Sequence, residues 1–180
     1  MLEPLRCFYP AEAFHRDYLD RHPAGYCHLP LKTFRYLRLY QDLKLFLGDE
    51  RDPLARMANA AALIQERMQF FWTGFYRVCG EQLVLGPFQG ETACMRIGYG
   101  KGVCGSAWKE RRTLVVPDVE KFPGHIACSS RSRSEIVVPL LRSGAVTAVL
   151  DVDSEEPGTF DAVDAAWLEM IAGAVDAFTE

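Results

Sequence analysis

The chain has 180 residues, of which 49% are apolar and 24% are charged, and its formal net charge is -4. This balance is typical of one globular domain with a sizeable core, and it argues against a disordered or fibrous protein. The negative charge argues against nucleic acid as a partner, because that needs a basic surface. No apolar stretch approaches the roughly 20 residues that span a bilayer, and the N-terminus lacks the apolar core of a signal peptide. We therefore expect a cytoplasmic protein with no membrane partner.

The chain contains six cysteines, which could serve as disulfides, metal ligands or free thiols. It is too large and too rich in apolar residues for a secreted disulfide scaffold. It has no C-x-x-C pair, and its one close pairing of cysteine with histidine is the adjacent Cys27 and His28. The sequence therefore predicts no metal site and favours reduced or catalytic thiols.

The first 31 residues differ from the rest of the chain. They are rich in Tyr, His and Arg, and four prolines interrupt any regular pattern, which predicts an irregular N-terminal arm. A first helix is expected over residues 32–48, which are dense in large apolar side chains and end at a glycine. A second is expected from Pro53 to Met68, where apolar residues recur at helical spacing.

The middle of the chain predicts short strands. Residues 71–78, 82–88 and 93–99 are rich in aromatic or β-branched side chains and are separated by glycines, which indicates an antiparallel meander. A glycine-rich loop around Cys104 follows, and a short helix is expected over residues 105–111. The next segment, residues 113–116, predicts one more strand.

The last third of the chain completes the expected architecture. Residues 120–134, which include Cys128, show no apolar period and predict a surface loop. Residues 135–141 and 145–153 predict a hairpin, and a closing helix is expected over residues 163–174. Because no regular βαβ alternation occurs, the fold class is predicted to be α+β, with a central antiparallel sheet flanked by helices.

Three acidic residues in the hairpin could form a chemical site. Side chains alternate along a strand, so Asp151 and Asp153 share one face, and Glu135 lies near the start of the neighbouring strand. Close carboxylates repel one another, which keeps at least one of them protonated and able to donate a proton. From the alternation alone, the other interpretation is that Asp151 and Asp153 end an exposed strand beside a solvated turn.

The aromatic residues and the histidine near these acids are less informative by themselves. Trp72, Phe75 and Tyr76 could build an aromatic wall, although aromatic residues in a strand are commonly core. His125 lies three residues before Cys128 and suggests a Cys/His pair, but a histidine in a loop is commonly solvated. We assign no base to it.

Six short runs stand out in the main part of the chain: LVLGPFQG (83–90), GVCG (102–105), VVPDV (115–119), FPGHIAC (122–128), SEIVVPL (134–140) and VLDVDS (149–154). Together they resemble the free methionine-(R)-sulfoxide reductases, a family with the GAF fold. The resemblance covers roughly residues 32–178 in order, so it is more specific than any single motif. It implies a GAF-like catalytic domain over residues 32–180, preceded by the arm of residues 1–31.

The resemblance implies a set of functional residues. The family's nucleophilic cysteine falls on Cys128 and its main resolving cysteine on Cys94, while Cys104 can also form a disulfide. Which of these two pairs first is left open. The family's substrate-binding residues fall on Glu135, Asp151, Asp153, Trp72 and Tyr76. Cys79 matches no role in the family.

This residue set fits thiol chemistry on free L-methionine-(R)-sulfoxide. The thiolate of Cys128 attacks sulfur, a protonated carboxyl helps the oxygen leave, and the resulting sulfenic acid condenses with a second cysteine. An external dithiol such as thioredoxin then reduces the disulfide, and no metal or organic cofactor is required. The sequence does not decide whether a homodimer forms.

Alternatives remain open for both the arm and the domain. Residues 7–29 resemble the C-terminal part of the peptide methionine-(S)-sulfoxide reductases without their GCFW nucleophile motif, so the arm is expected to be a passive relic; Cys27 as a relay thiol and a generic extension are the alternatives. For the domain, the alternative to catalysis is a GAF-type module that senses a small ligand. A purely structural subunit is a third class.

Overall fold

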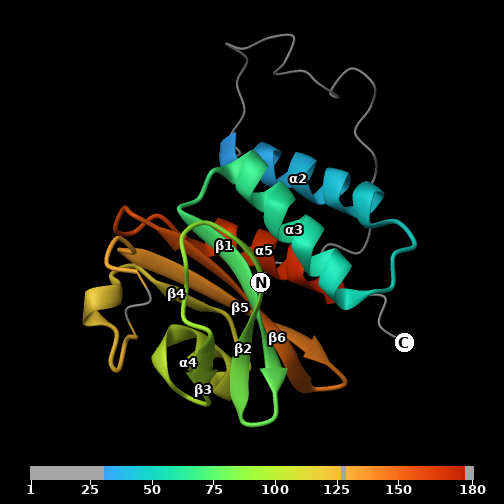
Figure 1. Ribbon diagram of the computed structural model, residues 1–180. Helices are drawn as coiled ribbons and strands as arrows, with labels where there is room; N and C mark the ends of the chain where they lie inside the picture. Colours follow the sequence, from blue (N-terminus) through green and yellow to red (C-terminus); the bar gives the residue numbers. More distant parts are fainter. Residues whose placement is uncertain (1–30, 127–128, 177–180) are drawn as a thin grey trace, which may run out of the picture. The chain divides into compact units, whose positions relative to one another are not determined.

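The computed structural model describes residues 31–126 and 129–176, and a six-stranded antiparallel sheet is at its centre (Figure 1). The strands lie in the order β3-β2-β1-β6-β5-β4. They are β1 (Trp72–Cys79), β2 (Gln82–Gln89), β3 (Arg96–Gly98), β4 (Leu114–Val116), β5 (Ser134–Arg142) and β6 (Ala145–Ser154). Neighbouring strands are antiparallel throughout.

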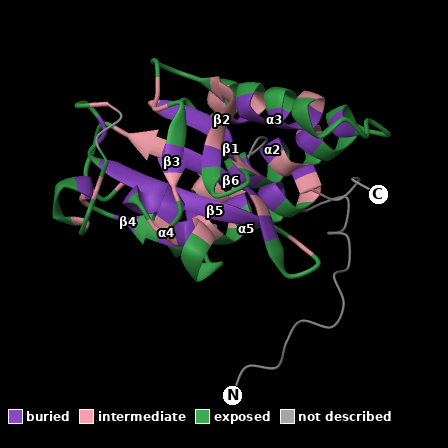
Figure 2. Cartoon of the chain, turned by 60° about the horizontal axis from the view of Figure 1, so that its bottom comes forward, coloured by how far each residue is buried: buried purple, intermediate pink, exposed green. Residues whose placement is uncertain are grey.

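Helices cover both faces of this sheet. One face carries α2 (Leu31–Leu47), α3 (Pro53–Met68) and α5 (Ala162–Asp176), while α4 (Gly102–Glu110) and the 3-10 turn η1 (Val119–Lys121) lie on the other (Figure 1). The central strands β5 and β6 are consequently buried along most of their length (Figure 2). The predicted α+β class with a helix-flanked antiparallel sheet is confirmed.

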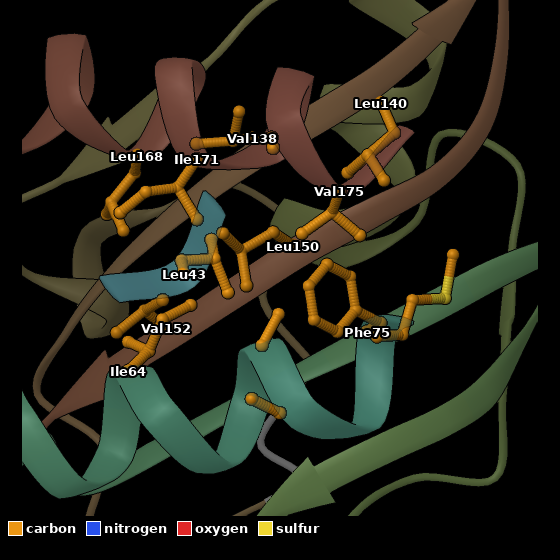
Figure 3. Close-up of a cluster of buried hydrophobic side chains, with 14 of the residues drawn as sticks. Leu43, Ile64, Phe75, Val138, Leu140, Leu150, Val152, Leu168, Ile171 and Val175 are labelled. Carbon is orange, nitrogen blue, oxygen red and sulfur yellow. The ribbon is translucent and has the colours of Figure 1, made fainter. Parts of the chain in front are cut away.

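Side-chain alternation in β6 divides the interior into two apolar clusters. Ala148, Leu150 and Val152 join the cluster under α2, α3 and α5, which Figure 3 shows in close-up. Val149 points to the opposite face and joins the cluster under α4. Because successive residues of a strand face opposite sides, one strand supplies the main core and, on its other face, the surroundings of the acidic residues.

Most predicted elements are confirmed, and two differ in extent. The strand expected over residues 93–99 is shortened to β3, because residues 92–95 form no ladder beyond one bond from Leu85 N–H to the Met95 carbonyl at 3.0 Å. The helix expected from Gly105 begins at Gly102 instead. Gly105 lies within this helix, and a Cβ at this position would clash with the carbonyl oxygen of Gly98.

The structure describes the main part of the chain but not the predicted arm. The chain separates into two units, with the boundary between Leu31 and Lys32. The arm lies outside the described residues, so its irregular conformation and its separation from a catalytic domain stay predictions. No helix in the described part of the chain is long and apolar enough to cross a membrane.

A buried arginine joins α3 to the end of α5. The side chain of Arg56 is 1% exposed. Its guanidinium donates hydrogen bonds to the carbonyls of Val175 at 2.9 Å, Ala174 at 2.6 Å and Glu50 at 2.7 Å. The last carbonyls of a helix have no partner within the helix, and a cation there also complements the helix dipole.

We predict that Arg56→Leu lowers the free energy of unfolding by roughly 2–4 kcal/mol, because it leaves one buried and two partly buried carbonyls without this donor. The matched control is Arg67→Leu, which removes an ion pair to Asp42 in which both side chains are about half exposed. Such pairs contribute less than about 1 kcal/mol. Denaturant unfolding of both variants measures the difference, and equal losses would contradict the proposed role of Arg56.

Candidate active site

Strand pairing brings the three acidic residues together on the face that carries α4. Glu135 on β5 lies opposite Asp153 on β6, and Asp151 lies opposite Val137, two positions along the same face. The thiol of Cys104, in the first turn of α4, lies 3.8 Å from the Glu135 carboxylate. Donor atoms of Cys104, Glu135 and Asp151 all lie within 4.8 Å of one another.

A cavity of about 50 Å³ lies above this cluster. Its walls include the three carboxyls, Cys104 and the predicted aromatic residues Trp72 and Tyr76. The segment on either side of residues 127 and 128 contributes His125, Ile126, Ser129 and Ser132 to the lining. The chemistry-bearing residues of four separate elements therefore meet at one small pocket.

The aromatic wall depends on two glycines. The Trp72 ring stacks on Tyr76, with centroids 6.1 Å apart, and on Phe88 at 5.4 Å. A Cβ at Gly74 would clash with the Trp72 ring, and a Cβ at Gly90 would come within 2.6 Å of it. The Trp72 Nε1–H donates to the Glu91 carbonyl at 3.0 Å, which holds the ring in place.

The third aromatic residue of the predicted wall does not reach the pocket. Phe75 alternates with Trp72 and Tyr76 along β1, so its ring lies in the core under α3 and α5 (Figure 3). For Phe75 the core interpretation is the correct one of the two left open, because a strand cannot present adjacent residues on one face. His125 does line the pocket, and burial lowers its pKa.

All three carboxyls hold their protons more strongly than free side chains do. Burial, followed by the charges of Asp151 and Asp153, raises the pKa of Glu135 well above its usual value. Burial and the charge of Asp153 raise the pKa of Asp151 in the same way. Burial also raises the pKa of Asp153 to about 6, against the effect of a hydrogen bond from Ser132. Protonated carboxyls are therefore available as donors near neutral pH.

The pocket is acidic and lacks a compensating cation. Neither lysine nor arginine occurs among the described residues that line it. One oxygen of Asp151, Oδ1, is buried and accepts no hydrogen bond from the described residues. A buried oxygen without a donor is unfavourable, so this arrangement suits a ligand that carries N–H donors and positive charge.

Ser132 is a site residue that the sequence analysis missed. Its hydroxyl donates to Asp153 Oδ1, and its side chain is buried at the edge of the pocket. Nothing in the Ser/Arg run of residues 129–134 distinguishes it from its neighbours in the sequence. Only the fold, which brings this run over the end of β6, identifies it.

The cysteines are in different states. Cys94 is disulfide-bonded, while Cys79 and Cys104 are free, so neither of these two is its partner. Cys79 is exposed. Burial and the charges of Asp151 and Glu135 raise the pKa of Cys104 well above its usual value. Cys128, predicted as the nucleophile, lies outside the described residues.

Comparison with known proteins identifies the family. The GAF domain family model matches residues 49–178. The free methionine-R-sulfoxide reductase of Escherichia coli K12 is 41% identical over 146 residues, which cover 81% of this chain and 88% of that protein. The chain belongs to the GAF-domain free methionine-R-sulfoxide reductase family. GAF domain-containing protein A of Dictyostelium discoideum is 50% identical over 146 residues, 81% of this chain and 92% of that protein.

A solved member of the family extends the comparison to the fold. The free methionine-R-sulfoxide reductase of Neisseria meningitidis, solved with its substrate, is 45% identical with a TM-score of 0.80, over 84% of this chain and 92% of that one. The family resemblance and the GAF-like fold are thus confirmed. The peptide methionine sulfoxide reductase family model matches residues 1–44, which confirms the separate resemblance of the arm.

The raised carboxyl pKa values predict how stability depends on pH. The unfolded chain ionises Asp153 near pH 3.8, but the folded protein does so only near pH 6. Protonation therefore favours the folded state below pH 4, and this contribution is lost as the pH rises through about 6.

The gain in free energy of unfolding from Asp153→Asn should consequently be larger at pH 8 than at pH 4. The difference should be on the order of 2 kcal/mol, since a tenfold change in proton binding is about 1.4 kcal/mol. The control is Asp118→Asn, because a hydrogen bond from Lys121 lowers the pKa of the partly buried Asp118 carboxyl. Between these two pH values the effect of Asp118→Asn on stability should change little, because the stabilisation from a lowered carboxyl pKa is lost only below about pH 4. Denaturant unfolding at both pH values gives the comparison, and a pH-independent effect of Asp153→Asn would count against the raised pKa.

Proposed function

We propose that this protein reduces free L-methionine-(R)-sulfoxide to methionine, with Cys128 as the nucleophile and an intramolecular disulfide as the oxidised product. The observation that carries the proposal is the meeting of three proton-holding carboxyls and an aromatic wall in one small pocket of a family member. The family's activity supplies the reaction class, and the pocket supplies the groups it needs.

Each part of the substrate has a matching group. The ammonium of a free amino acid suits the acidic pocket and Asp151 Oδ1, which accepts no hydrogen bond from the described residues. A peptide-bound methionine has no such ammonium. The methyl group fits against Trp72 and Tyr76, which are 4% and 1% exposed. A protonated carboxyl, from Glu135 or Asp153, donates a hydrogen bond to the sulfoxide oxygen.

The reaction then proceeds in two stages, reduction of the substrate and formation of a disulfide. The thiolate of Cys128 attacks the substrate sulfur and forms an S–S bond, and the oxygen takes up two protons and leaves as water. Water then cleaves the S–S bond of this sulfonium intermediate, which releases methionine, a proton and the sulfenic acid of Cys128. The thiol of a second cysteine condenses with this sulfenic acid, forming a disulfide and releasing water. Two cysteine thiols are oxidised for each sulfoxide that is reduced.

Cys94 is the better candidate for the resolving thiol. It is disulfide-bonded in this structure, whereas Cys104 is free. The raised pKa of Cys104 keeps its thiol protonated and unreactive, because the thiolate is the nucleophilic form. We propose Cys128 as the partner of Cys94, and Cys104 as a secondary thiol. Thioredoxin as the reductant, a passive arm and a homodimer stay predictions.

The cysteine roles predict distinct defects. Cys128→Ser should abolish methionine formation even in a single turnover of the reduced protein. Cys94→Ser should form about one equivalent of methionine and then stall with thioredoxin, since its sulfenic acid is not resolved efficiently. Quantifying methionine after rapid mixing tests both variants, with Cys79→Ser as a matched control on an exposed thiol. Normal product from Cys128→Ser would refute the mechanism.

The carboxyl roles predict a loss of rate without a loss of fold. Glu135→Gln and Asp153→Asn keep the side-chain shape but remove the proton that the carboxyl donates, so single-turnover rates should fall roughly 10²-fold. Glu156→Gln, on the turn after β6, is an exposed control that should keep the full rate. Circular dichroism would verify folding, and rates within about twofold of the unaltered protein would exclude a proton-donor role.

A sensing module is the competing function. It needs a pocket but no thiol that reacts with its ligand. Thiol titration before and after addition of methionine sulfoxide separates the two: the reductase loses two thiols per methionine formed, and the sensor loses none.

A further inference from the structure

The side chain of Arg131 contacts side chains from three other segments, one of which lines the pocket. Its guanidinium pairs with Glu91 at 2.5 Å and with Glu155 at 2.6 Å and 2.8 Å. It also lies 4.8 Å from the ring centroid of Phe71, which lines the pocket. All three charged side chains are about half exposed. Such a network is too exposed to be a major source of folding stability.

The positions of these residues in the sequence suggest another role. Glu91 lies three residues before Cys94, in the connection between β2 and β3, and Arg131 lies three residues after Cys128. We propose that the ion pair between Arg131 and Glu91 is a tether between two segments. It holds residues 90–95, the Cys94 segment, to the Cys128 segment, whose described part is residues 129–133, and so accelerates formation of the disulfide between Cys94 and Cys128. This inference rests on the proposed function and concerns only its second step.

The backbone anchors of the two segments are separate, which is why a tether is useful. Arg133 N–H donates to the Ser154 carbonyl at 2.8 Å, which fixes one segment to the end of β6. The other segment is fixed to the meander through Met95 and Trp72, by bonds of 3.0 Å each. A link between the segments raises the effective concentration of one thiol beside the other.

The tether would act on the condensation step alone. In that step the sulfenic acid of one cysteine loses its hydroxyl, the thiol of the other loses its proton, the S–S bond forms and water is released. The step that forms methionine uses the pocket, and the Glu91 carboxylate is not among the described groups that line it. Removing this carboxylate also leaves intact the bond from the Trp72 ring to the Glu91 carbonyl.

The test compares Glu91→Gln with Glu155→Gln in single turnover of the fully reduced, full-length chain with free methionine-(R)-sulfoxide. Both variants remove one partner of the same guanidinium, but only Glu91 belongs to the Cys94 segment. Methionine is measured directly, disulfide formation by quenched alkylation and mass spectrometry, and the sulfenic acid by trapping with dimedone.

We expect Glu91→Gln to slow disulfide formation about threefold to fivefold, the size of effect that half-exposed charge pairs produce. Methionine formation should keep its rate, and trapped sulfenic acid should increase. Glu155→Gln should slow the disulfide step less. The difference between the unaltered protein and Glu91→Gln should shrink in about 1 M salt, because exposed pairs are screened.

Three results would overturn the inference: an unchanged disulfide rate in Glu91→Gln, equal effects of the two variants, or an equal loss in both chemical steps. These differ from failure of the proposed function itself. In that case the unaltered protein forms no methionine and no disulfide, whereas failure of the tether leaves both products and removes only the difference between the variants.

Discussion

The burial of three carboxyls that lie close enough to repel one another is the constraint on which the site depends. Glu135, Asp151 and Asp153 lie on one face of two paired strands, and burial disfavours the ionised form of each. Because they cannot all ionise at low cost, protons are retained where solvent would remove them. The fold must hold these groups together against that repulsion. The apolar clusters on both faces of the sheet supply the stabilisation that does so.

The alternation of side chains along β6 explains how one strand can contribute both to the core and to the pocket. Leu150 and Val152 contribute to the larger core, while Asp151 and Asp153 reach the pocket on the opposite face. A shift of register by one residue would exchange the two sets, burying carboxyls among leucines and valines. The burial of β5 and β6 on both sides therefore fixes the geometry of the acids as firmly as it fixes the core.

The same local physics determines what the sequence could predict. Period-two alternation was enough to place Asp151 and Asp153 on one face and to bring Glu135 beside them. It could also have excluded Phe75 from the aromatic wall. Ser132 was not predictable, because its contact with Asp153 joins an irregular segment to a strand 21 residues away. The family resemblance, rather than periodicity, singled out Cys104, and only the fold shows its distance from Glu135.

The acidic pocket also separates the thiol chemistry from the proton chemistry. Burial, together with the charges of the neighbouring carboxyls, raises the pKa of Cys104, so its thiol stays protonated beside them. A resolving cysteine works better where the carboxyl charges do not reach it. Cys94 lies on a connection and is not itself among the described residues that line the pocket. Because the resolving thiol lies on such a connection, the step that needs assistance is the encounter of two segments rather than the loss of a proton from the thiol. The charges of Arg131 and Glu91 at the surface provide this assistance.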